Sequence, residues 1–224
     1  MKTPNQCKEE LWKTYLEYTD FPEEIKNKVR DIGLLFKNDV KFLYSVRKCV
    51  LNGGGAMEDE KNHILYETAD EYHILRKGDS EVALRQKEMS LLLANMIDIF
   101  EDILPLGSVV DLKKDFLGQQ MDLRNVDKVR VVISKRFIGG ETGCYYPYAA
   151  VIYPIGMGGR GRTFCFSAGL IEKVVHMGYS DLVEEAFVHE MKKKLIVNER
   201  RKSMGLANED ERKAMETLLL NSGE

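Results

Sequence analysis

Apolar residues recur every three or four positions in the first hundred residues and every second position in the central part of the chain. The clearest helical stripe has steps of three or four and predicts a long amphipathic helix; it comprises Ile25, Val29, Ile32, Phe36, Val40, Leu43, Val46 and Val50. Asn52–Gly55 ends it, because three glycines carry a large backbone entropy cost inside a helix. An earlier helix is predicted to begin at Thr3-Pro4, an N-cap residue followed by proline in the first helical position.

Residues 57–77 fit two patterns. Tyr66, Ala69, Tyr72 and Leu75 have helical spacing, whereas the segments 63–66 and 72–75 could pair as a β-hairpin. We favour the helix here.

A second strong helical stripe begins after Gly78-Asp79-Ser80 and ends at Pro105. Its residues are Val82, Met89, Leu93, Met96, Phe100 and Ile103. These stripes must pack either on one another or on the helix of a partner. On the second alternative the candidate partner-binding residues are Ile25, Val29, Ile32, Phe36, Val40, Leu43, Met89 and Met96.

From Gly107 the period changes to two, which predicts strands. The expected strands are 108–113, 129–137, 145–155, 163–167 and 173–179, and their short connections favour an antiparallel meander. Helical spacing returns after Ser180, which we expect to cap a helix with Val183, Phe187, Met191 and Leu195 on one stripe. Asn208 and Glu211 are expected to open a last helix that runs to about Leu220.

The chain is therefore expected to be an α+β protein with three parts. These are a helical region at 1–104, a five-strand antiparallel domain at 105–180, and C-terminal helices at 181–224 that pack on it.

The sequence IGMGGRGR, residues 155–162, contains a literal G-x-G-x-x-G at Gly156, Gly158 and Gly161. A dinucleotide site needs these glycines between a strand and a helix whose N-terminal amides hold the pyrophosphate. Here the residues that follow, 162–167, alternate and are rich in aromatics, which predicts a strand. We expect a hairpin loop; a small nucleotide-binding enzyme that uses Gly156–Gly161 is the remote alternative.

Composition narrows the function classes further. A net charge of −3 gives no global field to attract nucleic acid. The most apolar window, 91–106, is interrupted by Asp98, Glu101 and Asp102, so we expect no membrane span. The N-terminus has no apolar stretch typical of a signal peptide, and the four cysteines are scattered, as in a cytoplasmic protein. Glu185 and His189 have the spacing of a metal-binding pair but lack a third ligand, so we expect no metal site. We also expect no cofactor and no catalytic residue.

Three segments resemble one family in the right order. Leu104–Val110 contains PLGSVV, residues 148–156 read YAAVIYPIG, and residues 171–181 read IEKVVHMGYSD. Together they resemble a bacterial domain-of-unknown-function family, number 4176, over about residues 103–190. The motif positions, to which we assign a structural role, are Pro105, Leu106, Gly107, Ser108, Val109, Tyr153, Pro154, Gly156, Gly178 and Tyr179. Two departures, Ile155 and His176-Met177, leave the expected fold intact.

The resemblance implies no enzymatic activity. It implies an accessory role beside type VII secretion systems of Gram-positive bacteria, whose gene clusters encode toxins with an LXG domain. The expected function is that of a cytoplasmic chaperone or adaptor for the helical export domain of such a toxin. A secreted toxin or a small helical secretion factor is then the expected partner, and an immunity protein that neutralises the toxin is the alternative.

Overall fold

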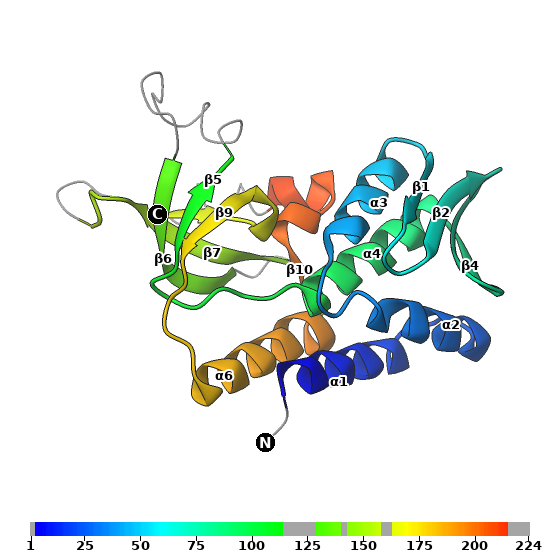
Figure 1. The fold of residues 1–224 in the computed structure, drawn as a ribbon, viewed down its shortest axis with the longest axis horizontal. Coiled ribbons are helices and arrows are strands. Elements are labelled where there is room, and N and C mark those ends of the chain that lie inside the picture. Colours follow the sequence, from blue (N-terminus) through cyan, green and yellow to red (C-terminus); the bar gives the residue numbers. More distant parts are fainter. Residues whose placement is uncertain (1–2, 114–128, 140–142, 158–162, 215–224) are drawn as a thin grey trace. The chain divides into compact units, whose positions relative to one another are not determined.

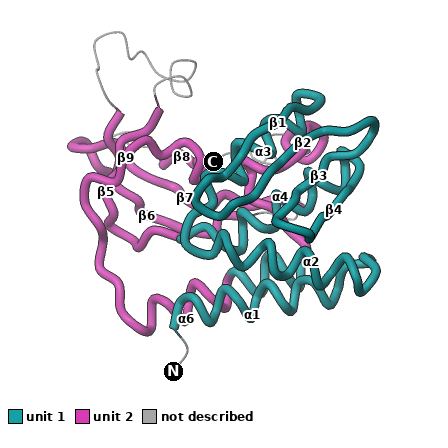
Figure 2. The backbone as a smooth tube through the Cα atoms, turned by 45° about the vertical axis from the view of Figure 1, so that its right-hand side comes forward, with its two compact units in different colours: residues 1–102, 192–199 teal, residues 103–191, 200–224 magenta. Residues whose placement is uncertain are grey.

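Two sheets and several helices make up this protein, which is α+β as predicted (Figure 1). The computed structural model describes residues 3–113, 129–139, 143–157 and 163–214. The chain divides into two units (Figure 2). Unit 1 comprises Met1–Asp102 and Lys192–Glu199, and unit 2 comprises Ile103–Met191 and Arg200–Glu224.

Unit 1 begins with helix α1, Pro4–Glu17, and the predicted cap is confirmed. The Thr3 hydroxyl accepts from the amide of Gln6, and the Gln6 side chain accepts from the amide of Thr3, which is a capping box. Trp12, the only tryptophan of the chain, is fully buried. Its ring stacks on Tyr15 at 5.6 Å and contacts Phe100 at 5.5 Å, so it lies at the centre of the helical core.

The long stripe forms two helices rather than one: α2, Glu23–Leu34, and α3, Lys41–Leu51. The chain turns at Asn38-Asp39, where the Asp39 carboxylate accepts from the amide of Lys41. Asn and Asp compete with helical hydrogen bonds through such local contacts, which explains the break. Helix α2 has Pro22 as its N-cap and no side-chain cap bond.

The helix favoured at residues 57–77 is wrong. The chain instead forms an antiparallel sheet of four strands in the order β1-β2-β3-β4. The strands are β1 Ala56–Asp59, β2 Ile64–Ala69, β3 Tyr72–Lys77 and β4 Ser80–Arg85. Two-residue turns, Asp70-Glu71 and Gly78-Asp79, join the last three strands, and Asp70 and Gly78 have the positive φ that such turns require.

Val82 accordingly belongs to β4, and helix α4 starts only at Gln86 and ends at Phe100. One face of the four-stranded sheet carries the buried side chains of Tyr66, Leu75 and Val82. This face contributes to the same core as α2, α3 and α4. Unit 1 is therefore itself α+β and not purely helical.

Unit 2 is built on a six-stranded sheet with the order β10-β7-β6-β5-β9, and β8 also pairs with β7. Its strands are β5 Val109–Leu112, β6 Val129–Gly139, β7 Cys144–Ile152, β8 Phe164–Phe166, β9 Ile171–His176 and β10 Lys202–Ser203. The predicted meander is confirmed from β5 to β8. It fails at β9, which pairs with β5 at the other edge, and at β10, a sixth strand that runs parallel to β7.

The link from β8 to β9 requires the unit 2 sheet to curl. Those two strands are four strand spacings apart along the sheet, about 19 Å if it were flat. The four residues between them, 167–170, leave five Cα–Cα steps from Phe166 to Ile171, which span about 17 Å even when fully extended. They include the 3₁₀ turn Ala168–Leu170, which shortens the span further. Curling encloses one core, in which Val110, Val131, Tyr148 and Phe166 are buried together.

After β9 the chain forms helix α6, Leu182–Lys192, then the π-helix η2, Lys193–Asn198, and the 3₁₀ turn η3, Met204–Leu206. The cap of α6 is Asp181 rather than Ser180, because the Asp181 carboxylate accepts from the amides of Val183 and Glu184. Asn208 and Glu211 bond to each other's amides at the start of a last helix, as predicted. Its expected end near Leu220 lies outside the described residues.

Gly33 provides a test of the unit 1 core. A Cβ atom on Gly33 would stand 2.5 Å from Nε1 of Trp12. Alanine normally favours a helix over glycine by about 1 kcal/mol. We expect the overlap to reverse this, so that Gly33→Ala lowers the free energy of unfolding by roughly 2 kcal/mol. Denaturant unfolding monitored by Trp12 fluorescence measures the change, and a stabilised variant would contradict this packing.

Candidate functional site

The eight predicted partner-binding residues lie in the core of unit 1. Seven are buried: Val29, Ile32, Phe36, Val40, Leu43, Met89 and Met96. Ile25 is partly buried. The intramolecular alternative therefore accounts for these stripes, and the assignment of these residues to a partner surface is corrected. A partner has to bind elsewhere.

The first family motif forms a tight junction with the third. Ser108 is fully buried; its hydroxyl donates to the carbonyl of Pro105 at 2.8 Å and accepts from the amide of Gly178 at 3.0 Å. Gly107 has a φ of +79°, and its amide donates to the carbonyl of Ile133. We call Pro105–Ser108 with Gly178 the motif clasp. It joins the start of β5 to the residues after β9, which is a structural role.

The remaining motif residues lie apart from the clasp or on its outside. Tyr153, Pro154 and Gly156 form the turn after β7, where Gly156 has a φ of +64° and its amide donates to the carbonyl of Ile152. Val109 is the first residue of β5. Leu106, within the clasp, and Tyr179, next to it, have exposed side chains.

The glycine-rich segment does not lead into a helix. Gly158 and Gly161 lie outside the described residues, but β8 follows them and pairs antiparallel with β7. The predicted strand after residue 162 is thus confirmed. The strand–turn–helix geometry that a dinucleotide needs is not formed by β7 and β8.

A run of exposed apolar side chains of unit 2 follows the chain from β9 into α6. We call this set the apolar strip; it comprises Val174, Val175, Met177, Tyr179, Leu182, Val183 and Phe187. Val183 is 77% exposed and Tyr179 is 80% exposed. Exposed apolar side chains gathered in one part of a protein are typical of sites that bind another protein, and these residues lie close together along the chain.

Two features of the fold position the apolar strip. The β9 end of the strip lies on an edge strand, which among the described strands pairs only with β5. The α6 end is held to β6 by Arg136, whose guanidinium pairs with both carboxylate oxygens of Glu184 and lies 5.4 Å from the Phe187 ring centre. Phe137, with an unusual φ of +53°, packs edge-on against the same ring. The pair with Arg136 thus fixes one face of α6, while Leu182 and Val183 stay in solvent.

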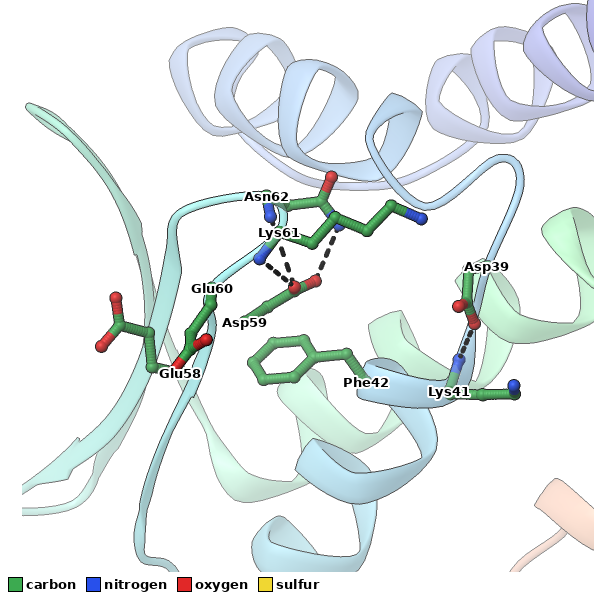
Figure 3. A pocket seen from close by; sticks show the side chains of 8 residues that line it. All are labelled: Asp39, Lys41, Phe42, Glu58, Asp59, Glu60, Lys61 and Asn62. Atoms are coloured by element: carbon green, nitrogen blue, oxygen red, sulfur yellow. Dashed lines mark hydrogen bonds between the residues drawn. The ribbon is translucent and has the colours of Figure 1, made fainter.

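Unit 1 carries an acidic groove of about 630 Å³ between the start of α3 and the β1–β2 turn (Figure 3). Its lining comprises Asp39, Lys41, Phe42, Glu58, Asp59, Glu60, Lys61 and Asn62. The Asp59 carboxylate is occupied within the turn, where it accepts from the amides of Lys61 and Asn62 and from the Asn62 side chain. Within the described residues, no three His, Cys, Asp or Glu side chains are placed to hold a metal ion.

A polar pair is buried beneath the four-stranded sheet's inner face. The Tyr66 hydroxyl lies 2.7 Å from Nδ1 of His73, and burial raises the pKa of Tyr66 and lowers the pKa of His73. Both shifts favour the neutral forms, which suits a hydrogen bond that links β2 to β3. We assign this pair a structural role.

The structure thus defines an α+β protein in which the N-terminal stripes form the core of unit 1. Unit 2 is a curled sheet with the apolar strip at its edge. Residues 103–187 match the family model described as domain of unknown function (DUF4176), the family that the three sequence segments resemble. No curated protein and no solved structure matches the chain. None of the helices in the described part combines the length and apolar character that a membrane span needs.

Gly178 tests the motif clasp. A Cβ atom there would overlap the carbonyl oxygen of Leu106 and stand 2.9 Å from the amide nitrogen of Ser108, and backbone atoms cannot easily give way. We expect Gly178→Ala to lower the free energy of unfolding by roughly 3 kcal/mol. Gly143→Ala is the matched control, because its Cβ would meet no atom within 4 Å. Equal unfolding midpoints for the two variants would show that the clasp is not tight.

Proposed function

We propose that this protein is a non-enzymatic, cytoplasmic accessory protein of a bacterial type VII secretion system. In this proposal it acts as a chaperone or adaptor that binds the helical export domain of an LXG-type toxin. The family match supports the association with such systems only through the resemblance described above. The observation that carries the binding role is the apolar strip, Val174 to Phe187, on the DUF4176 domain.

The chemistry of the apolar strip suits a helical partner. An amphipathic helix binds by laying its apolar face against exposed apolar residues, and β9 and α6 present such residues in sequence. Glu172, Asp181 and Glu190 are exposed alongside them, as is Lys173. The acidic residues among these outnumber the basic one, which favours a partner helix with basic residues beside its apolar face.

Co-expression with an LXG-type toxin, which the proposal expects to be encoded beside this protein, tests the proposal. The N-terminal and C-terminal halves of the toxin are tagged separately and used in pull-downs with the full chain. We expect capture by the N-terminal half. Val183→Glu should reduce this capture at least tenfold, because a charge at a buried interface position costs more than about 1.4 kcal/mol of binding free energy.

Leu91→Glu is the matched control, since Leu91 is a helical residue of unit 1 that is 44% exposed and lies outside the apolar strip. It should leave capture unchanged. Capture by the C-terminal half alone would contradict the chaperone role and indicate an immunity protein. Equal losses for Val183→Glu and Leu91→Glu would contradict the assignment of the strip.

A further inference from the structure

Helix α6 turns an apolar face to water and charged side chains to the protein. The five exposed residues of this helix recur at i, i+1, i+4, i+5 and i+8, a spacing that places them on one face. They are Leu182, Val183, Ala186, Phe187 and Glu190, and we call them the outer face of α6. The opposite side is half-buried or buried, and its charged residues include Glu184, Glu185 and Lys192. An ordinary surface helix has the reverse arrangement, with its apolar stripe turned inward.

One ion pair holds α6 in this rotation. The Arg136 guanidinium pairs with both carboxylate oxygens of Glu184, and the Arg136 side chain is only 4% exposed. Phe187, at the border of the outer face, places its ring against Arg136 and Phe137. The rest of the outer face stays in water, where Val183 is 77% and Leu182 56% exposed. Such apolar area is stabilised when another molecule covers it.

Charge changes sign along this helix. Its start is acidic, because Asp181 is exposed and caps the helix, and Glu185 lies half-buried one turn later. The helical backbone continues past the end of α6 into η2, and this end is basic. Three lysines there outnumber two glutamates; they are Lys192, Lys193 and Lys194 against Glu190 and Glu199. Lys194 is 64% exposed and lies 4.0 Å from Glu199, at the limit of an ion pair, so its charge is open to a neighbour.

We propose that a second copy of this chain covers the outer face of α6, with the two copies of the helix antiparallel. An antiparallel neighbour places its acidic start beside the basic end of the first helix, and a two-fold axis makes this contact twice. Ala186, in the middle of the outer face, lets the two backbones approach closely. Helix α6 thus has the chemistry deduced for the partner of the apolar strip, an apolar face with basic residues beside it. This inference does not depend on the secretion role, and a toxin helix would compete with the second copy.

The size of the outer face sets how strongly the copies associate. The 11 residues of α6 form a helix about 16 Å long. A pair of such helices buries less than the roughly 800 Å² per partner that is usual in stable complexes. We therefore expect a weak dimer with a Kd of about 10–100 µM, which forms in concentrated solution and dissociates on dilution.

Sedimentation equilibrium of the full chain, at concentrations from well below to well above this Kd, tests the proposal. We expect the average mass to rise from that of one chain towards that of two. Val183→Glu should weaken the dimer at least about tenfold, because it places a charge within the apolar contact. Asp181→Asn, which keeps a residue that can cap the helix, should weaken an antiparallel dimer about threefold. In a parallel dimer the same change would remove a repulsion and strengthen association.

Leu91→Glu is the matched control, since Leu91 is an exposed helical leucine of unit 1 outside the outer face of α6, and it should dimerise like the wild type. Circular dichroism and Trp12 fluorescence confirm that each variant is folded. A wild-type chain that stays single at the highest concentration, a dimer that survives Val183→Glu, or a stronger dimer in Asp181→Asn would overturn the proposal. A monomeric chain that still captures the toxin would refute this inference and leave the proposed function standing.

Discussion

The shortness of the link between β8 and β9 is the constraint on which unit 2 depends. Four residues join opposite edges of the sheet, so both edges must approach one another around a shared core. The buried Ser108 and the close contact at Gly178 then hold the start of β5 to the end of β9. The motif residues Pro105–Ser108 and Gly178 accordingly act as a closure point of this sheet.

That closure leaves apolar residues in water. A sheet that curled into a complete barrel would have no free edge, whereas here β9 ends the path of described strands and its side chains beyond Ile171 are exposed. The chain continues from β9 into α6 with more apolar side chains outside than inside. Arg136 holds this helix by its polar side, through Glu184, and so turns Leu182 and Val183 to solvent. The proposed binding role depends on this arrangement.

In unit 1 the strongest apolar pattern of the sequence forms the core and not a binding surface. Its amphipathic stripes are buried by packing around Trp12 and against the inner face of the four-stranded sheet. Polar groups also stay buried there at the end of α4, where the Lys192 ammonium donates to the carbonyls of Ile99 and Glu101. Burying this lysine costs desolvation energy that a well-packed apolar residue would not.

The sequence by itself determined the elements whose signals are local. The α1 capping box, the alternation from β5 to β8, the strand after the glycine-rich segment, and the α+β class depend on near neighbours along the chain. The prediction of a helix at residues 57–77 failed because the spacing of the apolar residues there fits a hairpin as well as a helix. These residues are Tyr66, Ala69, Tyr72 and Leu75. The Gly78-Asp79 dipeptide between two six-residue runs was the available signal for a hairpin.

Tertiary structure alone decided which apolar stripe faces water, the pairing of β9 with β5, and the entry of Lys192 into unit 1. In each case the partners are far apart in sequence: Lys192 meets the carbonyl of Ile99, and Gly178 meets Ser108. A periodic pattern states that a face must be buried, but it carries no information on what covers it. Which element covers a given face depends on how the shapes of all the elements fit together when every apolar face is buried at the same time.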